Sequence, residues 1–211
     1  MIEAFLDISN NYFDGPPFDG SIFTPMQELT YLDISSNWLS STFPLAIAEL
    51  PRLSALYATS VRLSGDLSFL SDFRPNLFEL WLDNNTFTGT IPSEIGRLTG
   101  LASLSFSDCG LDGTIPSEIG LLTNMQQMWL FGNRLVAPLP TELGSLSQLR
   151  IFQVEGNAIN GTMPLQVCSL RNNQTGLVSL GADCHTTVQC TCCTCCTDPC
   201  PFVSLPSRKV L

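Results

Sequence analysis

Positive charge is scarce in this sequence of 211 residues. It contains one lysine and eight arginines against 19 acidic residues, which gives a formal net charge of −10 at pH 7. Binding to phosphate groups depends on dense positive charge, so this balance disfavours nucleic acids and anionic membrane surfaces as partners. A basic, a neutral or a polysaccharide ligand fits the composition better.

Long apolar runs are also missing, and histidine occurs once. No apolar stretch approaches the roughly 18 residues that cross a bilayer. The amino-terminal stretch has Glu3 and Asp7 where a secretory signal would carry basic and then apolar residues. The single histidine, His185, stands among cysteines, so no Ser-His-Asp or Cys-His arrangement is available in the rest of the chain. We therefore expect no catalytic residues, no cofactor and no resident metal.

What the sequence does contain is one pattern, repeated every 24 residues. The blocks superimpose on L-x-x-L-x-L-x-x-N-x-L-x-G-x-I-P-x-x-I-G-x-L-x-x. They begin at Leu29, Leu53, Leu77, Leu101, Met125 and Leu149. A fixed period of this kind is typical of a solenoid, in which each turn contacts only its neighbours.

The first part of each block predicts a short strand with one buried face, because apolar residues alternate with others at a period of two. Stacked strands then form a parallel sheet along one side of the solenoid. A single turn buries too little apolar surface to offset the entropy of ordering it, so neighbouring turns are required. In the third block the side chains expected to point inward are Leu77, Leu80, Leu82, Phe87, Ile91, Ile95 and Leu98.

The ninth position of each block is expected to join the turns. A carboxamide there can bond to the backbone of adjacent turns, where unpaired groups would cost about 1 to 3 kcal/mol each. Cys109 and Val61 depart from the pattern, and only cysteine is an accepted substitute. The asparagines at this position are Asn11, Asn37, Asn85, Asn133 and Asn157.

Glycine followed by an apolar residue and proline closes the pattern, as at Gly89, Gly113 and Gly161. This G-x-I-P signature resembles the plant-type leucine-rich repeat of receptor-like proteins, receptor kinases and wall-enzyme inhibitors of plants and some algae. The resemblance covers residues 3–171, about seven turns. It implies an α/β repeat solenoid, a right-handed superhelix with a parallel sheet on the concave face and 3-10 or irregular segments on the convex side. It also implies that the concave face carries ligand recognition.

Cysteines crowd the end of the chain, where the periodicity fades. We expect a disulfide-bonded cap over residues 172–200, which implies an oxidising compartment, followed by a flexible tail over residues 201–211. Cys109 would be the one free thiol. The ending resembles leucine-rich-repeat proteins of diatoms and related algae. The disulfide candidates are Cys168, Cys184, Cys190, Cys192, Cys193, Cys195, Cys196 and Cys200, and the sequence does not choose among their pairings.

A metal site is the alternative interpretation of this cysteine-rich segment. Cys192 and Cys195, and likewise Cys193 and Cys196, have the C-x-x-C spacing that suits thiolate coordination of zinc or copper(I).

The concave face is the expected place of the function, because alternation sends the third, fifth and seventh residues of each turn outward, with the eighth at the rim. Aromatic anchors interleaved with acids are what a recognition surface uses. The alternative is that aromatics merely favour strands and that the acids keep the sheet solvated. The candidate ligand-binding residues are Tyr31, Asp33, Tyr57, Glu79, Trp81, Asp83, Asp108, Trp129, Phe131 and Glu155.

The ends and the glycosylation signals suggest where the protein resides. The first turn has no polar cap, so we expect a fragment whose amino-terminal part is missing and whose signal or membrane anchor lies outside this chain. Sequons at Asn84, Asn160 and Asn173 are compatible with a secretory pathway. We therefore expect an extracellular or cell-surface location.

These observations favour a non-catalytic recognition module of a receptor-like protein, with a protein or peptide partner of basic character or a cell-wall polysaccharide. One alternative is a secreted inhibitor of a hydrolase, similar to polygalacturonase inhibitors, which would use the same face. Another alternative is an ice-binding or surface-binding protein. The only support for it is the threonine that recurs at equivalent positions, at Thr42, Thr90, Thr114 and Thr162.

Overall fold

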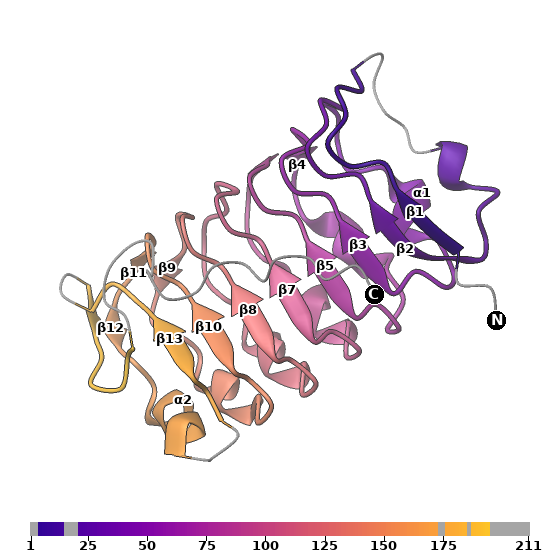
Figure 1. Cartoon of the computed structure of the whole chain (residues 1–211). Helices are drawn as coiled ribbons and strands as arrows, with labels where there is room; N and C mark the ends of the chain where they lie inside the picture. Colours follow the sequence, from indigo (N-terminus) through magenta and orange to yellow (C-terminus); the bar gives the residue numbers. More distant parts are fainter. Residues whose placement is uncertain (1–3, 15–20, 173–175, 185–186, 195–211) are drawn as a thin grey trace.

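The computed structural model of the chain is a solenoid of stacked turns with a parallel sheet along one side (Figure 1). It describes residues 4–14, 21–172, 176–184 and 187–194. Eight strands, all parallel, form the sheet in the order β1-β2-β3-β5-β7-β8-β10-β13. Their bounds are Ala4–Asp7, Leu29–Asp33, Ala55–Tyr57, Glu79–Trp81, Ser103–Ser105, Gln127–Trp129, Ile151–Gln153 and Ser179–Gly181.

The other side of each turn from β1 to β10 carries a short helical segment, and in the turn of β10 the helix α2 continues directly into η6. Most of these segments are 3-10 helices, as expected, although two turns form a short α-helix instead. The 3-10 helices are η1 Ser21–Phe23, η2 Ser68–Ser71, η3 Ser93–Arg97, η4 Ser117–Leu121, η5 Thr141–Ser145 and η6 Leu170–Asn172. The α-helices are α1 Leu45–Ala48 and α2 Leu165–Ser169.

Three pairs of two-residue strands join neighbouring turns between the sheet and the helical side. They are β4 Ser64–Gly65 with β6 Thr86–Phe87, β9 Val136–Ala137 with β11 Ala158–Ile159, and β12 Gly161–Thr162 with β14 Val188–Gln189.

The hydrophobic core runs through the stack as one cluster. The seven residues predicted to point inward from the third block are all buried, none more than 3% exposed. Burial of this kind contributes about 25 cal/mol per Å² of apolar surface, and each turn supplies part of the surface that its neighbours cover. The inward set predicted from the sequence is therefore confirmed.

Four ninth-position asparagines, Asn37, Asn85, Asn133 and Asn157, bond to the preceding turn as predicted, whereas Asn11 donates to carbonyls of its own turn. The Asn133 amide nitrogen donates to the carbonyl of Phe106 in the preceding turn at 2.7 Å and to Leu130 in its own turn at 3.0 Å. Its side-chain oxygen accepts from the backbone N–H groups of Cys109 and Leu111 at 3.2 and 3.0 Å. One side chain thus satisfies buried backbone groups of two turns, which would otherwise stay unpaired.

Cys109 takes the same position with fewer bonds. Its thiol donates to the carbonyls of Leu82 at 3.2 Å and Ser107 at 3.4 Å. Burial raises the pKa of this thiol to about 12. Since the thiolate is the reactive form, the side chain is a weak nucleophile at neutral pH.

We expect Cys109 to resist alkylation in the folded protein. Iodoacetamide at pH 8 should leave it unmodified in buffer and modify it in 6 M guanidinium, because unfolding returns the thiol pKa to its ordinary range near 8.5. Intact mass measured before and after each treatment reports the result. A full carbamidomethyl adduct on the folded chain would contradict the burial of this residue.

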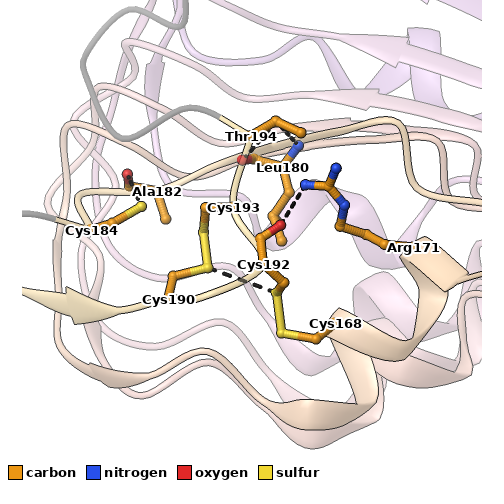
Figure 2. Close-up of a disulfide and its surroundings, with 9 residues drawn as sticks. All are labelled: Cys168, Arg171, Leu180, Ala182, Cys184, Cys190, Cys192, Cys193 and Thr194. Carbon is orange, nitrogen blue, oxygen red and sulfur yellow. Dashed lines mark hydrogen bonds between the residues drawn. A yellow bond between two sulfur atoms is a disulfide. The ribbon is translucent and has the colours of Figure 1, made fainter.

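The carboxyl-terminal end of the sheet is covered by a disulfide-bonded segment (Figure 2). Disulfides join Cys168 to Cys192 and Cys190 to Cys193. Thr194 lies beside the last strand, where its N–H donates to the Leu180 carbonyl at 2.8 Å. The disulfide interpretation is therefore confirmed for these four cysteines.

The remaining predictions for this segment have different outcomes. Cys184 is also disulfide-bonded, and its sulfur lies within 4.8 Å of those of Cys190 and Cys193. As disulfide sulfurs these atoms do not offer the thiolates that zinc or copper(I) requires. Among the described residues, Cys109 is the free cysteine, as expected. Cys195, Cys196, Cys200, His185 and the predicted flexible tail 201–211 lie outside the described residues.

Candidate functional site

The concave face is built by the residues that alternate with the core leucines. In β5, Leu80 is fully buried in the core, and Glu79 and Trp81 on either side of it point the other way. The in-register pairing Tyr57↔Trp81↔Ser105 places the same position of successive turns in one row. The outward orientation that the period of two predicted is therefore confirmed.

Aromatic rings form a continuous ladder across this face. Phe5 stacks on Tyr31 with the ring centroids 4.1 Å apart, and Tyr31 is 5.3 Å from Tyr57. Tyr57 is 5.5 Å from Trp81, and Trp81 is 5.5 Å from Trp129. Phe5 extends the predicted set by one ring, and its register with Tyr31 is the signal that identifies it. Ring pairs at these spacings contribute about 0.5 to 1.5 kcal/mol each beyond their buried area.

The two tryptophans are not exposed as predicted. Trp129 is fully buried and Trp81 is 8% exposed, although neither belongs to the hydrophobic core cluster. Ser105 lies in register between the two tryptophans. Because its side chain is small, the two indole rings contact each other edge to face across it. The Trp81 indole N–H also donates to Ser103 Oγ at 2.9 Å. The prediction of exposed anchors is wrong for these two residues because the small neighbours let the rings pack on each other.

Three of the predicted acids are also buried rather than solvated. Asp33 and Glu155 are fully buried and Asp83 is 6% exposed. Asp33 accepts from the Ser35 N–H at 2.9 Å. A Cβ on Gly181 would collide with the Glu155 carboxylate, so the glycine makes room for that side chain. These three acids are therefore not accessible on the face as the recognition interpretation expected, and the alternative, that they keep the sheet solvated, does not hold for them either.

Asp83 organises the centre of the face. Its carboxylate accepts hydrogen bonds from the Ser105 hydroxyl and from the Ser107 N–H, the latter at 2.9 Å. Burial raises the pKa of this carboxyl, and the hydrogen bonds from both serines act in the opposite direction. The folded state therefore binds the Asp83 proton more tightly than the unfolded state does. The stabilisation that comes from protonated Asp83 is present below the ordinary aspartate pKa and is lost as the pH rises above it.

The remaining predicted residues are accessible. Tyr31, Tyr57, Glu79 and Phe131 are half-buried, and Asp108 is exposed. The Tyr57 hydroxyl donates to the Glu79 carboxylate.

Asp108 also has a backbone role that the alternation did not reveal. It has a positive φ of 53°, a conformation that aspartate and asparagine tolerate better than most residues. The same conformation recurs at the eighth position of other turns, at Ser36, Ser60, Asn84 and Gly132.

The glycosylation candidates differ in their surroundings. Asn84 is exposed, but its amide nitrogen already donates to Ser60 Oγ at 2.8 Å. Asn160 is exposed. Asn173 lies outside the described residues.

Charge on the concave face has one sign. None of the seven arginines that the structure describes stands at the third, fifth, seventh or eighth position of a turn. The one ion pair among the described residues, Arg52 with Glu28, lies outside these positions. A strip of rings bordered by carboxylates suits a ligand with positive charge and apolar side chains.

Comparisons with known proteins agree with this architecture. The Leucine Rich Repeat family model matches residues 28–50, 76–98 and 100–122. Receptor-like protein 39 of Arabidopsis thaliana is 34% identical over 90 residues, 42% of this chain and 10% of that protein. Cuscuta receptor 1 of Solanum lycopersicum is 38% identical over 82 residues, 37% of this chain and 7% of that protein. The chain thus spans about a tenth of the length of these curated relatives.

Solved structures show the same fold. The Arabidopsis receptor kinase HAESA, in complex with the peptide hormone IDA and the co-receptor SERK1, matches with a TM-score of 0.69 at 28% identity. That match covers 77% of this chain and 26% of HAESA. The PEPR1–AtPEP1 structure matches with a TM-score of 0.67 at 30% identity, over 74% of this chain and 22% of that one. In the described part of the chain, no helix combines the length and apolar character that crossing a bilayer requires.

Proposed function

We propose that this chain, whose repeats match the Leucine Rich Repeat family model, is the ligand-recognition part of an extracellular or cell-surface, receptor-like protein. The observation that carries the proposal is the aromatic ladder from Phe5 to Trp129, which crosses the sheet between acidic residues. The accessible rings of the ladder, Phe5, Tyr31 and Tyr57, supply apolar contact area at low conformational cost. The accessible carboxylates of Glu79 and Asp108 set the orientation of a bound chain.

The ligand in this proposal is a protein or peptide of basic character. An extended peptide presents side chains to both the rings and the acids, and the face carries no described arginine that would repel it. The HAESA structure supports this ligand class, because it holds a peptide hormone. A cell-wall polysaccharide would use the rings but would not need the carboxylates.

The extracellular location is supported by the disulfides, which persist in oxidising compartments. The comparisons give no support to a hydrolase inhibitor, since the matched relatives and structures named above are receptor-like proteins and receptor kinases. The role proposed here is binding and not catalysis.

A random dodecamer peptide library panned on the full-length chain tests this function. We expect the selected peptides to be enriched in arginine and lysine, and their affinity to fall at least tenfold in the double variant Glu79→Gln, Asp108→Asn. Both residues are accessible on the concave face, so their replacement removes charge without opening the core. Isothermal titration at low and high salt measures the change, which should shrink as salt screens the charges.

The matched control is Glu118→Gln, Glu142→Gln, which removes the same charge from η4 and η5 on the helical side of the turns. It should leave the affinity unchanged. Selected peptides without basic enrichment, or binding that only the control variant weakens, would overturn the proposed function.

A further inference from the structure

Two disulfides lie against each other where α2 meets the carboxyl-terminal cap (Figure 2). The Sγ atoms of Cys190 and Cys192 belong to different disulfides and are 3.8 Å apart. Cys190 is bonded to Cys193 with the C-x-x-C spacing that is typical of exchanging dithiols. A thiolate formed at Cys192 would therefore stand next to a second disulfide, which is the arrangement that thiol–disulfide exchange requires.

A pocket of about 600 Å³ lies beside this pair of disulfides. Both partners of one disulfide, Cys168 and Cys192, line the pocket, and so does Cys193 of the other. All three residues are half-buried and not enclosed in the core. Because the rate of exchange depends on access to the sulfur that is attacked, the pocket offers a small thiol a way to the Cys168–Cys192 bond.

Arg171 gives this pocket a positive charge. It follows α2 in η6 and lines the pocket together with Ser169 and Thr191. Its Nη1 donates to the Cys192 carbonyl, which holds the guanidinium against the backbone of the disulfide. No carboxylate forms an ion pair with Arg171 among the residues that the structure describes. A guanidinium in this place can bind the carboxylate of a ligand and stabilise a thiolate that leaves beside it.

The attacking sulfur has to come from another molecule. Cys109, the free cysteine among the described residues, is 2% exposed and lies in the turn of β7, inside the stack. It therefore cannot reach the cap. An external thiol that carries a negative charge fits the pocket, because Arg171 has no carboxylate of its own.

We propose that this pocket binds a small thiol that carries a carboxylate, and that this thiol moves the covalent link between the cap and α2. The carboxylate binds Arg171, and the thiolate attacks Cys168 Sγ. A bond forms between the ligand sulfur and Cys168, the Cys168–Cys192 bond breaks, and the electron pair leaves on Cys192 Sγ.

The second step uses the short distance between the two disulfides. The Cys192 thiolate attacks Cys190 Sγ, 3.8 Å away. A Cys190–Cys192 bond forms, the Cys190–Cys193 bond breaks, and Cys193 leaves as a thiolate that takes a proton from solvent. Two disulfides and one thiol are present before and after these steps, so the exchange needs no oxidant or reductant.

The exchange changes what holds the cap in place. The Cys168–Cys192 bond joins residues 24 positions apart and ties α2 to the segment after β14. The Cys190–Cys192 bond joins near neighbours and ties the cap only to itself. A disulfide that closes a longer loop constrains the chain more strongly, so the end of the solenoid becomes less stable where such a thiol is abundant.

Reduced glutathione, a thiol with carboxylates, tests the proposal on the complete chain. After the reaction, iodoacetamide blocks the thiols, and trypsin cleaves after Arg150 and Arg171, which separates the peptide of Cys168 from that of the cap. We expect glutathione on Cys168 and a carbamidomethyl group on Cys193, located by fragmentation in the mass spectrometer. A Cys168 peptide still joined to the cap peptide, or a blocked thiol at a cap cysteine other than Cys193, would refute the inference.

The rate of glutathione addition tests the role of Arg171, and intact mass followed over time measures it. The unmodified chain should react about tenfold faster with glutathione than with cysteamine, a thiol that carries an amine, at equal thiolate concentration. Arg171→Gln should remove this preference, and Arg171→Lys should keep most of it. The matched control is Arg150→Gln, which replaces an exposed arginine that does not line the pocket and should leave the preference unchanged. Equal rates with both thiols, or an equal loss in the control, would show that Arg171 does not bind the ligand and would refute the proposed site.

Discussion

Replacing Asn133 by alanine is expected to lower the free energy of unfolding by about 3 to 5 kcal/mol, more than a typical point mutation. The side chain is 7% exposed and bonds to backbone groups of two turns, among them the Phe106 carbonyl and the Leu111 N–H. Alanine leaves these buried groups unpaired, and each costs about 1 to 3 kcal/mol. Urea unfolding followed by circular dichroism measures the loss.

Asn124→Ala is the matched control. Asn124 is an exposed asparagine that donates one bond, to the Thr99 carbonyl at 2.9 Å. Its backbone partner can bond to water after the substitution, so the expected cost is below about 1 kcal/mol. Equal effects of the two substitutions would show that the ninth-position carboxamide does not hold the turns together.

Truncating Trp129 to alanine is expected to destabilise the chain by about 3 to 5 kcal/mol, as for other buried aromatic residues. The indole is fully buried and packs on Trp81 over Ser105. The sequence pattern led to the opposite expectation, that Trp129 is an aromatic anchor exposed on the concave face. Thermal and urea unfolding distinguish the two expectations.

Trp38→Ala provides the comparison, because Trp38 is 46% exposed and its ring contacts Arg62 and Tyr12 near the surface. Its removal should cost about 1 kcal/mol or less. If the Trp129→Ala protein were as stable as the Trp38→Ala protein, Trp129 would be a replaceable surface residue and the prediction would be wrong. A binding assay on the concave face should therefore use Glu79 and Asp108, whose replacement leaves the ladder intact.

The repeat pattern alone was enough to predict the stack. Leu80 and its equivalents recur at a spacing that admits one arrangement, a strand per turn with the leucines inward, and the ninth-position asparagine has buried partners only in such a stack. The disulfide cap was also predictable as a region, although the partners Cys168–Cys192 and Cys190–Cys193 were not. Pairing depends on which sulfurs the folded backbone brings together.

The sequence by itself determined which side of each strand a residue occupies, because alternation depends only on neighbours along one chain. Burial on the concave side was decided by the tertiary structure. Trp81 and Trp129 meet because Ser105 leaves space between them, and Asp83 is enclosed by the serines of the next turn. Such contacts join residues more than twenty positions apart, and their outcome depends on the size of whatever side chain stands between them. A period of two in a single strand carries no information about that size.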